Sequence, residues 1–132
     1  MELGINVTLK GEMDQVIEKV TEALKEQGFG ILTRIDVDKT FKTKIDVDFR
    51  PYVILGACNP TLAHKALSAR PDVGLMLPCN VTVEQSQAGQ CNVSFIDPAM
   101  MMQFGDLGQD PVLADVGAEA AKKISAAAAK LG

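Results

Sequence analysis

The chain has 132 residues, a length that suits one domain, and residues 1–132 are expected to form a single unit. Hydrophobic residues make up 47% of the sequence and charged residues 23%, the balance of an ordinary globular domain. The net charge of -4 and an aromatic content of 5% argue against nucleic acid as a partner, because its binding uses clustered Lys and Arg and aromatic rings that stack on bases.

A membrane partner is not expected either. No segment approaches the roughly 18 apolar residues that a membrane span needs. The N-terminus lacks a basic segment followed by an apolar run, so no secretory signal is predicted. The three cysteines are an odd number and suit a reducing compartment, in which they stay free thiols. These features predict a cytoplasmic location.

The first part of the chain has the pattern strand, helix, strand. Apolar residues alternate with others over residues 3–9, which predicts a half-buried strand. Residues 13–24 carry apolar side chains at helical spacing, and Gly28 suits the left-handed residue that ends such a helix. Alternation returns over residues 31–37 and predicts a second strand.

A short helix and a buried strand are expected next. Phe41 and Ile45 are four residues apart, which is typical of one helix face, and Asp38 is placed to cap that helix. Residues 52–57 are a short continuous apolar run, which predicts a strand buried on both faces.

Three later helices have the same start signal, an Asn or Asp followed by proline. The pairs are Asn59-Pro60, Asp97-Pro98 and Asp110-Pro111. The Asn or Asp side chain accepts hydrogen bonds from the free N–H groups of the first turn, and proline suits the first helical position. We therefore expect helices from 60 to about 69, from 98 as a short segment stopped at Gly105, and from 111 onward, the last packed on the core.

Between these helices the sequence predicts a β-hairpin. Matching its apolar faces places residue 83 opposite 93 and residue 81 opposite 95, with Gly89 in a three-residue loop. The whole pattern predicts an α+β fold, with a largely antiparallel sheet of about five strands and helices packed on one face.

The cysteines are the main candidates for a site. The hairpin register places Cys91 near the tip and Cys79 at the base, about 20 Å apart, so Cys91 is expected to be a separate core thiol. Cys58 directly precedes a helix cap, where the helix dipole favours a thiolate and a lowered pKa.

Whether Cys79 approaches Cys58 depends on the path of residues 70–78. A helix over 60–76 would separate the two thiols. Pro71 and Gly74 disfavour that helix, so we expect an extended return through residues 73–77. On this path one end of the sheet gathers the candidate ligand-binding residues Cys58, Asn59, Cys79, Asn80 and Asp97.

Two segments carry a resemblance to a known family: residues 49–60, which end in Ala57-Cys58-Asn59-Pro60, and residues 74–81, which contain Pro78-Cys79-Asn80. Together with Glu26-Gln27-Gly28-Phe29 and Asp97-Pro98, they make the chain similar to the domain of unknown function 302 family over residues 1–130. The resemblance implies a small α+β domain, assembled as a homodimer, and no assigned reaction. It also implies that the two Cys-Asn motifs are the positions typical of the family.

Three functions remain open. The first is a binding module for a small molecule or a soft metal, zinc or copper, held by Cys58 and Cys79 with His64 or Asp97 as further ligands. The second is a homodimeric interaction domain, in which the cysteines belong to the core and the Asn residues are caps and turns. The third is a thiol-based redox protein with Cys58 as the catalytic nucleophile. We rank an enzyme last.

Overall fold

Residues 2–132 are described by a computed structural model, in which five β-strands form one sheet. In chain order the strands are β1 (Gly4–Lys10), β2 (Gly30–Asp36), β3 (Tyr52–Cys58), β4 (Cys79–Gln87) and β5 (Gln90–Ile96). Their spatial order is β1-β5-β4-β3-β2, and every neighbouring pair is antiparallel. The predicted antiparallel α+β fold is confirmed, and β1 and β2 are its two edge strands.

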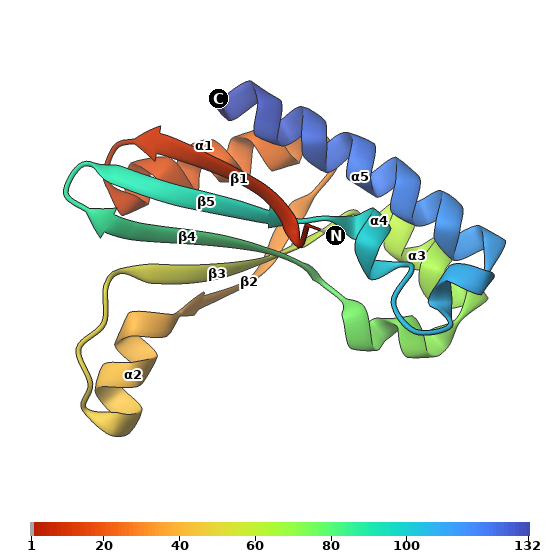
Figure 1. Cartoon of the computed structure of the whole chain (residues 1–132), viewed down its shortest axis with the longest axis horizontal. Helices are drawn as coiled ribbons and strands as arrows, with labels where there is room; N and C mark the ends of the chain where they lie inside the picture. The colour runs from red at the N-terminus through yellow and green to blue at the C-terminus, as the bar shows by residue number, and fades with distance from the viewer. Residues whose placement is uncertain (1) are drawn as a thin grey trace.

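The helices are distributed unevenly around this sheet. They are α1 (Met13–Glu26), α2 (Val37–Ile45), α3 (Pro60–Ala69), α4 (Pro98–Met101) and α5 (Pro111–Leu131), with 3-10 turns η1 (Pro71–Met76) and η2 (Leu107–Gln109). Figure 1 shows α1 and the long α5 together over one face of the sheet, with α3 and α4 next to α5 at one end. Helix α2 projects from the opposite end, away from the other helices. Within residues 2–132 every helix is too short or too polar to cross a membrane.

The core lies between the sheet and this helical layer. Alternate residues of β4 and β5 point into it, so Val83 and Val93 are completely buried. The other face of the sheet is polar, where Ser94 donates a hydrogen bond to Asn6 at 2.7 Å and Thr8 donates one to Asn92 at 3.1 Å. The alternation of apolar and polar residues therefore gives a two-layer structure with one open sheet face.

All three helix starts predicted from Asn-Pro and Asp-Pro pairs are confirmed. The cap side chains accept hydrogen bonds from first-turn N–H groups: Asn59 from Leu62 at 3.2 Å, Asp97 from Ala99 and Asp110 from Val112, both at 2.9 Å. In each case proline occupies the first turn. These caps fix where α3 and α4 leave the sheet and where α5 begins after η2.

The hairpin has the predicted register but a different loop. Val83 lies opposite Val93, as expected. The loop has two residues between Gln87 and Gln90, where the sequence predicted three, and Gly89 has the expected positive φ of 73°. An irregularity in the pairing between Glu84 and Gln87 absorbs the one-residue difference, because a bulge inserts an unpaired residue into one strand.

Two local predictions are wrong. Asp38 does not cap α2: the cap position is Asp36, and the Asp38 carboxylate instead accepts the N–H of Tyr52 at 3.2 Å. The return from α3 is not extended through residues 73–77, because residues 71–76 form η1. Within residues 73–77 only Leu77 has extended backbone, and the turn still brings Cys79 back beside β3.

Candidate functional site

An apolar cavity lies at the end of the sheet where β3 finishes and β4 begins. Its volume is about 310 Å³. The end of the sheet, the linker before β4 and helices α3 to α5 supply its wall, which includes Ala57, Cys58, Asn59, Leu62, Ala63, Ala66, Leu77, Pro78, Cys79, Pro98, Met102, Val116, Gly117 and Ala120. Polar groups contribute almost nothing to this surface.

Small side chains explain why the cavity is open. Ala63 and Ala66 face it from α3, three residues apart on one side of the helix. Gly117 and Ala120 face it from α5 with the same spacing. Helices that packed here through Leu or Ile would fill the space, as protein cores normally do. The sequence therefore reserves part of this volume by placing Ala63 and Ala66 where larger core residues would otherwise lie. Gly117 instead makes room for Met102, since a Cβ at Gly117 would lie 2.9 Å from the Met102 Cβ.

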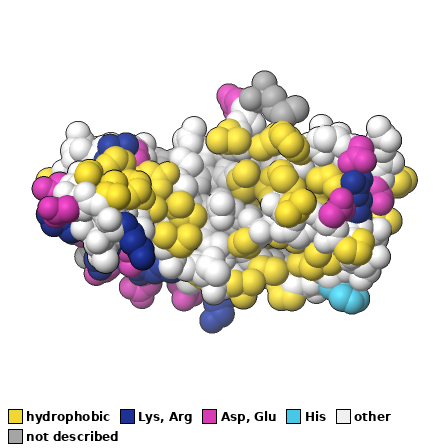
Figure 2. All heavy atoms as spheres, turned by 90° about the horizontal axis from the view of Figure 1, so that it is seen from below, with side chains coloured by type: hydrophobic (Ala, Val, Ile, Leu, Met, Phe, Trp, Pro, Cys, Tyr) yellow, Lys and Arg dark blue, Asp and Glu magenta, His cyan; other side chains and the backbone are white. Residues whose placement is uncertain are grey.

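The mouth of the cavity has apolar side chains in contact with solvent. Leu32 on β2 is 67% exposed and Leu67 on α3 is 40% exposed, and both line the cavity. Figure 2 shows hydrophobic side chains gathered over the α3 end of this face of the molecule. An apolar surface of this kind, continuous with a cavity, is typical of a binding site.

The two thiols of the Cys-Asn motifs lie at the same end of the sheet, as predicted, and both line this cavity. Cys79 begins β4 directly opposite Ala57, the residue before Cys58. Cys79 is buried and Cys58 is half-buried near the mouth. Opposite Cys58 on the edge strand lies Gly30, which has no side chain to cover the thiol.

Burial keeps both thiols protonated. It raises the pKa of Cys79 to about 11, with a smaller contribution from the neighbouring Cys58. Burial also raises the pKa of Cys58. The lowered pKa predicted for Cys58 is therefore wrong: the loss of hydration outweighs the helix start, where the Asn59 side chain already satisfies one free N–H group.

Asn59 joins the cavity wall to the end of α1. Its side-chain oxygen caps α3, and its amide nitrogen lies next to Gly28, where an added Cβ would be only 3.0 Å away. Gly28 has a φ of 82°, as predicted for the residue that ends α1. The first Cys-Asn motif thus has a structural role and a position in the cavity wall at once.

Gly56 allows two wall residues to approach the sheet closely. A Cβ at this position would lie 2.1 Å from the Thr33 hydroxyl oxygen and 2.8 Å from a ring carbon of Pro78. Both residues line the cavity. The bare backbone of β3 is therefore what lets Thr33 and Pro78 pack over the strand beside the mouth.

The remaining predicted site residues lie outside the cavity. Asn80 follows Cys79 on the same strand, so it points to the open sheet face, into a hollow that it shares with Tyr52, Thr82 and Ser94. The Asp97 carboxylate caps α4, and only its neighbour Pro98 reaches the cavity. His64 is exposed on α3 and is not among the wall residues.

Cys91 is a separate thiol, as expected. It is completely buried near the hairpin tip, where its sulfur donates to the Gly11 carbonyl oxygen at 3.5 Å and lies 3.8 Å from the Met13 sulfur. Burial raises its pKa, with a smaller contribution from Glu12. These contacts describe a core residue.

Within residues 2–132, no group of three or more His, Cys, Asp and Glu side chains is arranged to hold a metal ion. The cavity wall offers the thiols of Cys58 and Cys79 and the thioether of Met102 as its soft donors. Its chemistry is therefore that of an apolar container with two neutral thiols in the wall.

The cavity itself was not predicted from the sequence. A signal was present: pairs of small residues three apart, Ala63 with Ala66 and Gly117 with Ala120, stand on the inner sides of two helices. Small residues on a buried helix face also allow close helix packing, so the spacing alone does not distinguish a void from a tight contact.

The fold and the cavity define a class: a small two-layer α+β domain with an apolar, thiol-containing pocket at one end of an antiparallel sheet. The family described as "Domain of unknown function DUF302" matches residues 5–131, and the chain belongs to it. A crystal structure of an "uncharacterized conserved protein DUF302 from Bacillus stearothermophilus" covers 100% of both chains at 30% sequence identity, with a TM-score of 0.86. No curated protein matches the chain.

Proposed function

We propose that this protein binds a small, predominantly apolar molecule in the cavity between α3, α5 and the end of the sheet. The observation that supports this most is the nearly complete absence of polar groups from the wall of a cavity of about 310 Å³. A polar ligand would lose its hydration there without finding hydrogen-bond partners. An apolar ligand would gain from leaving water.

The size of the cavity suits a ligand larger than a single ring. An apolar cavity of about 150 Å³ accommodates benzene, and natural ligand pockets begin at about 300 Å³. At about 310 Å³ the cavity has room for roughly two such rings or a chain of similar volume. Thr33, Asn59 and the two cysteines are the lining residues with polar side-chain groups, and these groups contribute almost nothing to the wall, so the ligand is expected to carry at most one small polar end.

A fluorescence titration with 1-anilinonaphthalene-8-sulfonate tests this proposal. Ala63 is half-buried in the wall, so Ala63→Phe should fill the cavity and weaken probe binding at least about tenfold. Ala69→Phe is the matched control, because Ala69 is exposed on the same helix and lies outside the wall. Equal probe affinity for both variants would refute the proposal.

A soft metal is a second candidate, supported by the position of Met102 in the same wall as Cys58 and Cys79. Thiolates with a thioether suit Cu(I) better than zinc, which prefers four ligands. The raised thiol pKa values count against a metal, because binding must displace both protons. Competition against a Cu(I) chelator tests it: an affinity that Cys58→Ser leaves unchanged would exclude this site.

A thiol enzyme receives less support, since an activated nucleophile needs a lowered pKa and burial raises that of Cys58.

We retain the proposals of a homodimer and of a reducing compartment such as the cytoplasm. The homodimer is supported by apolar side chains exposed along the edge strand β2, where Ile35 is 49% exposed. The compartment is supported by three free thiols.

A further inference from the structure

The segment from residue 37 to residue 51, here called the arm, forms α2 and the loop after it without burying a single side chain. A nine-residue helix is too short to be stable by itself in water, because most helical stability in proteins comes from packing of an apolar face. Ordering the arm also costs conformational entropy that its own contacts do not repay. The arm therefore lacks the packing partner that such a helix needs.

The arm nevertheless carries apolar and aromatic side chains. Phe41 and Phe49 pack edge to face with their ring centres 5.3 Å apart, and the ring centres of Phe49 and Tyr52 are 6.2 Å apart. Ile45 is 64% exposed and Val47 is 44% exposed. Figure 2 shows a second gathering of hydrophobic side chains, over α2. The exposed apolar side of the arm is thus a surface suited to contact another protein.

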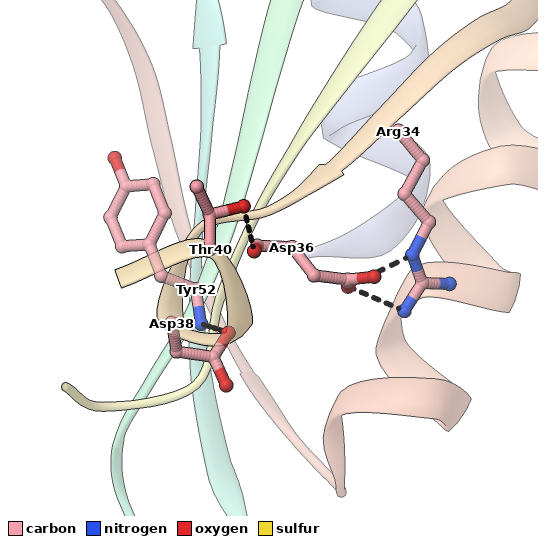
Figure 3. A network of polar contacts seen from close by, with 5 residues as sticks. All are labelled: Arg34, Asp36, Asp38, Thr40 and Tyr52. Carbon is pink, nitrogen blue, oxygen red and sulfur yellow. Dashed lines mark hydrogen bonds and ion pairs between the residues drawn. The ribbon is translucent and has the colours of Figure 1, made fainter. Parts of the chain in front are cut away.

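Polar contacts hold the base of the arm in place, as Figure 3 shows. The Arg34 guanidinium pairs with the Asp36 carboxylate at 3.1 Å, Thr40 donates to the Asp36 carbonyl at 3.0 Å, and the Tyr52 N–H donates to Asp38 at 3.2 Å. These bonds set the direction in which the arm leaves the sheet. They do not cover its apolar side chains.

The surface around the cavity mouth also has exposed apolar side chains without a packing partner. Leu32 and Leu67 line the mouth, and Leu75 on η1 is 88% exposed nearby, since Gly74 lies against Leu67. In Figure 2 the hydrophobic side chains over α2 and those over the α3 end lie at opposite ends of one face of the molecule. A two-fold axis passing between them would bring the arm of each copy onto the mouth of the other.

We propose that the occupant of this face is a second copy of the chain, with the arm of each protomer closing the other's cavity. The closure rests on the proposed ligand-binding function; the contact between arm and mouth does not. Such a contact is made twice in a closed pair, so both apolar surfaces of each copy are covered at once.

Unpaired charges on the two surfaces can meet. Next to α3, Arg70 is bound by two carboxylates, those of Asp72 and Asp106, both at 2.8 Å, which leaves one negative charge in excess. On the arm Lys42 is likewise bound by two carboxylates, whereas Lys39 and Lys44 make no ion pair with any residue from 2 to 132. Residues 37–49 carry three Lys and three Asp, so the complementarity is local, between these two lysines and the excess carboxylate near the mouth.

Sedimentation equilibrium of the full chain tests the contact. The wild type should be a dimer, and Ile45→Asp on the arm should weaken dimerisation at least about tenfold. Leu3→Asp is the matched control, since Leu3 is 74% exposed but precedes β1, at the opposite edge of the sheet, and should stay dimeric. A monomeric wild type, or an Ile45→Asp variant with wild-type dimerisation, would overturn the inference.

Charge rescue then tests which surfaces meet. Leu75→Lys alone should also be monomeric, whereas a mixture of Leu75→Lys with Ile45→Asp should form heterodimers, because one contact becomes an Asp–Lys pair and the other remains native. A mixture that stays monomeric would overturn the assignment of the arm to the mouth. Both substitutions are at exposed positions, and circular dichroism should report unchanged folding.

The release rate of 1-anilinonaphthalene-8-sulfonate, followed by stopped flow, tests closure. The Ile45→Asp monomer should release the probe at least about tenfold faster than the wild-type dimer. Equal rates would refute closure and leave the cavity as a ligand site. A dimeric wild type that takes up no probe would refute the proposed function and closure together, while the contact between arm and mouth would be judged by the rescue alone.

Discussion

The buried Cys79 thiol should make this protein less stable at alkaline pH. In the folded protein burial raises the pKa of Cys79 to about 11, whereas in the unfolded chain the pKa is that of a free thiol, about 8.5. Between these values the unfolded chain loses its proton and the folded protein keeps it, so the folded state binds more protons. Stability is then unaffected below about pH 8.5 and falls as the pH rises toward 11.

The free energy of unfolding should fall by about 1.4 kcal/mol between pH 8.5 and pH 9.5, because a group that is deprotonated only in the unfolded chain changes this free energy by that amount per pH unit. Urea unfolding followed by circular dichroism, at several values between pH 7.5 and 9.5 with reductant present, measures it. Other groups titrate in this range, so the contribution of Cys79 is the difference in the free energy of unfolding between the wild type and Cys79→Ala, followed over pH. Curves that stay parallel for the two proteins would refute the assignment of a buried, neutral thiol.

Three substitutions test the packing around the site. Gly56→Ala should destabilise the protein by about 1–3 kcal/mol, because the new methyl group collides with the Thr33 hydroxyl and Pro78; an unchanged urea midpoint would contradict this. Gly117→Ala places a Cβ 2.9 Å from the Cβ of Met102, so it should lower both the stability of the protein and its affinity for the probe. An increase in stability, from the better helix propensity of Ala, would show instead that α4 moves freely to make room. Asp110→Ala removes the cap of α5 and should cost about 1 kcal/mol. Asp115→Ala, at an exposed position in the second turn of the same helix, should cost far less.

The parts of the fold that follow from local chemistry were predictable. Asn59-Pro60 and Asp110-Pro111 mark helix starts because the side-chain cap and the fixed proline φ act within one turn. The facing of Val83 and Val93 follows from a period of two, which the sheet imposes on every residue. The same period separates Cys79 from Asn80, so the two could not share one side of β4.

The rest depended on contacts between distant segments. The irregular pairing near Gln87 has no sequence signal, because a bulge shifts the register without changing the apolar pattern. The pKa of Cys58 depends on how far the folded chain removes the thiol from water, and this outweighs its position before α3. The cavity combines Ala63 from α3 with Gly117 from α5, so it exists only once the fold is assembled.

The most direct test of the central claim is a map of where an apolar ligand binds. Two-dimensional NMR of methyl groups during a titration with 1-decanol would provide it. Our account predicts saturable shifts at wall residues such as Leu62, Met102 and Val116, and none at Leu3, which precedes the edge strand β1 and is not a wall residue. Shifts that do not saturate, or that centre on the open sheet face around Thr82, would contradict the proposal that this cavity is the binding site.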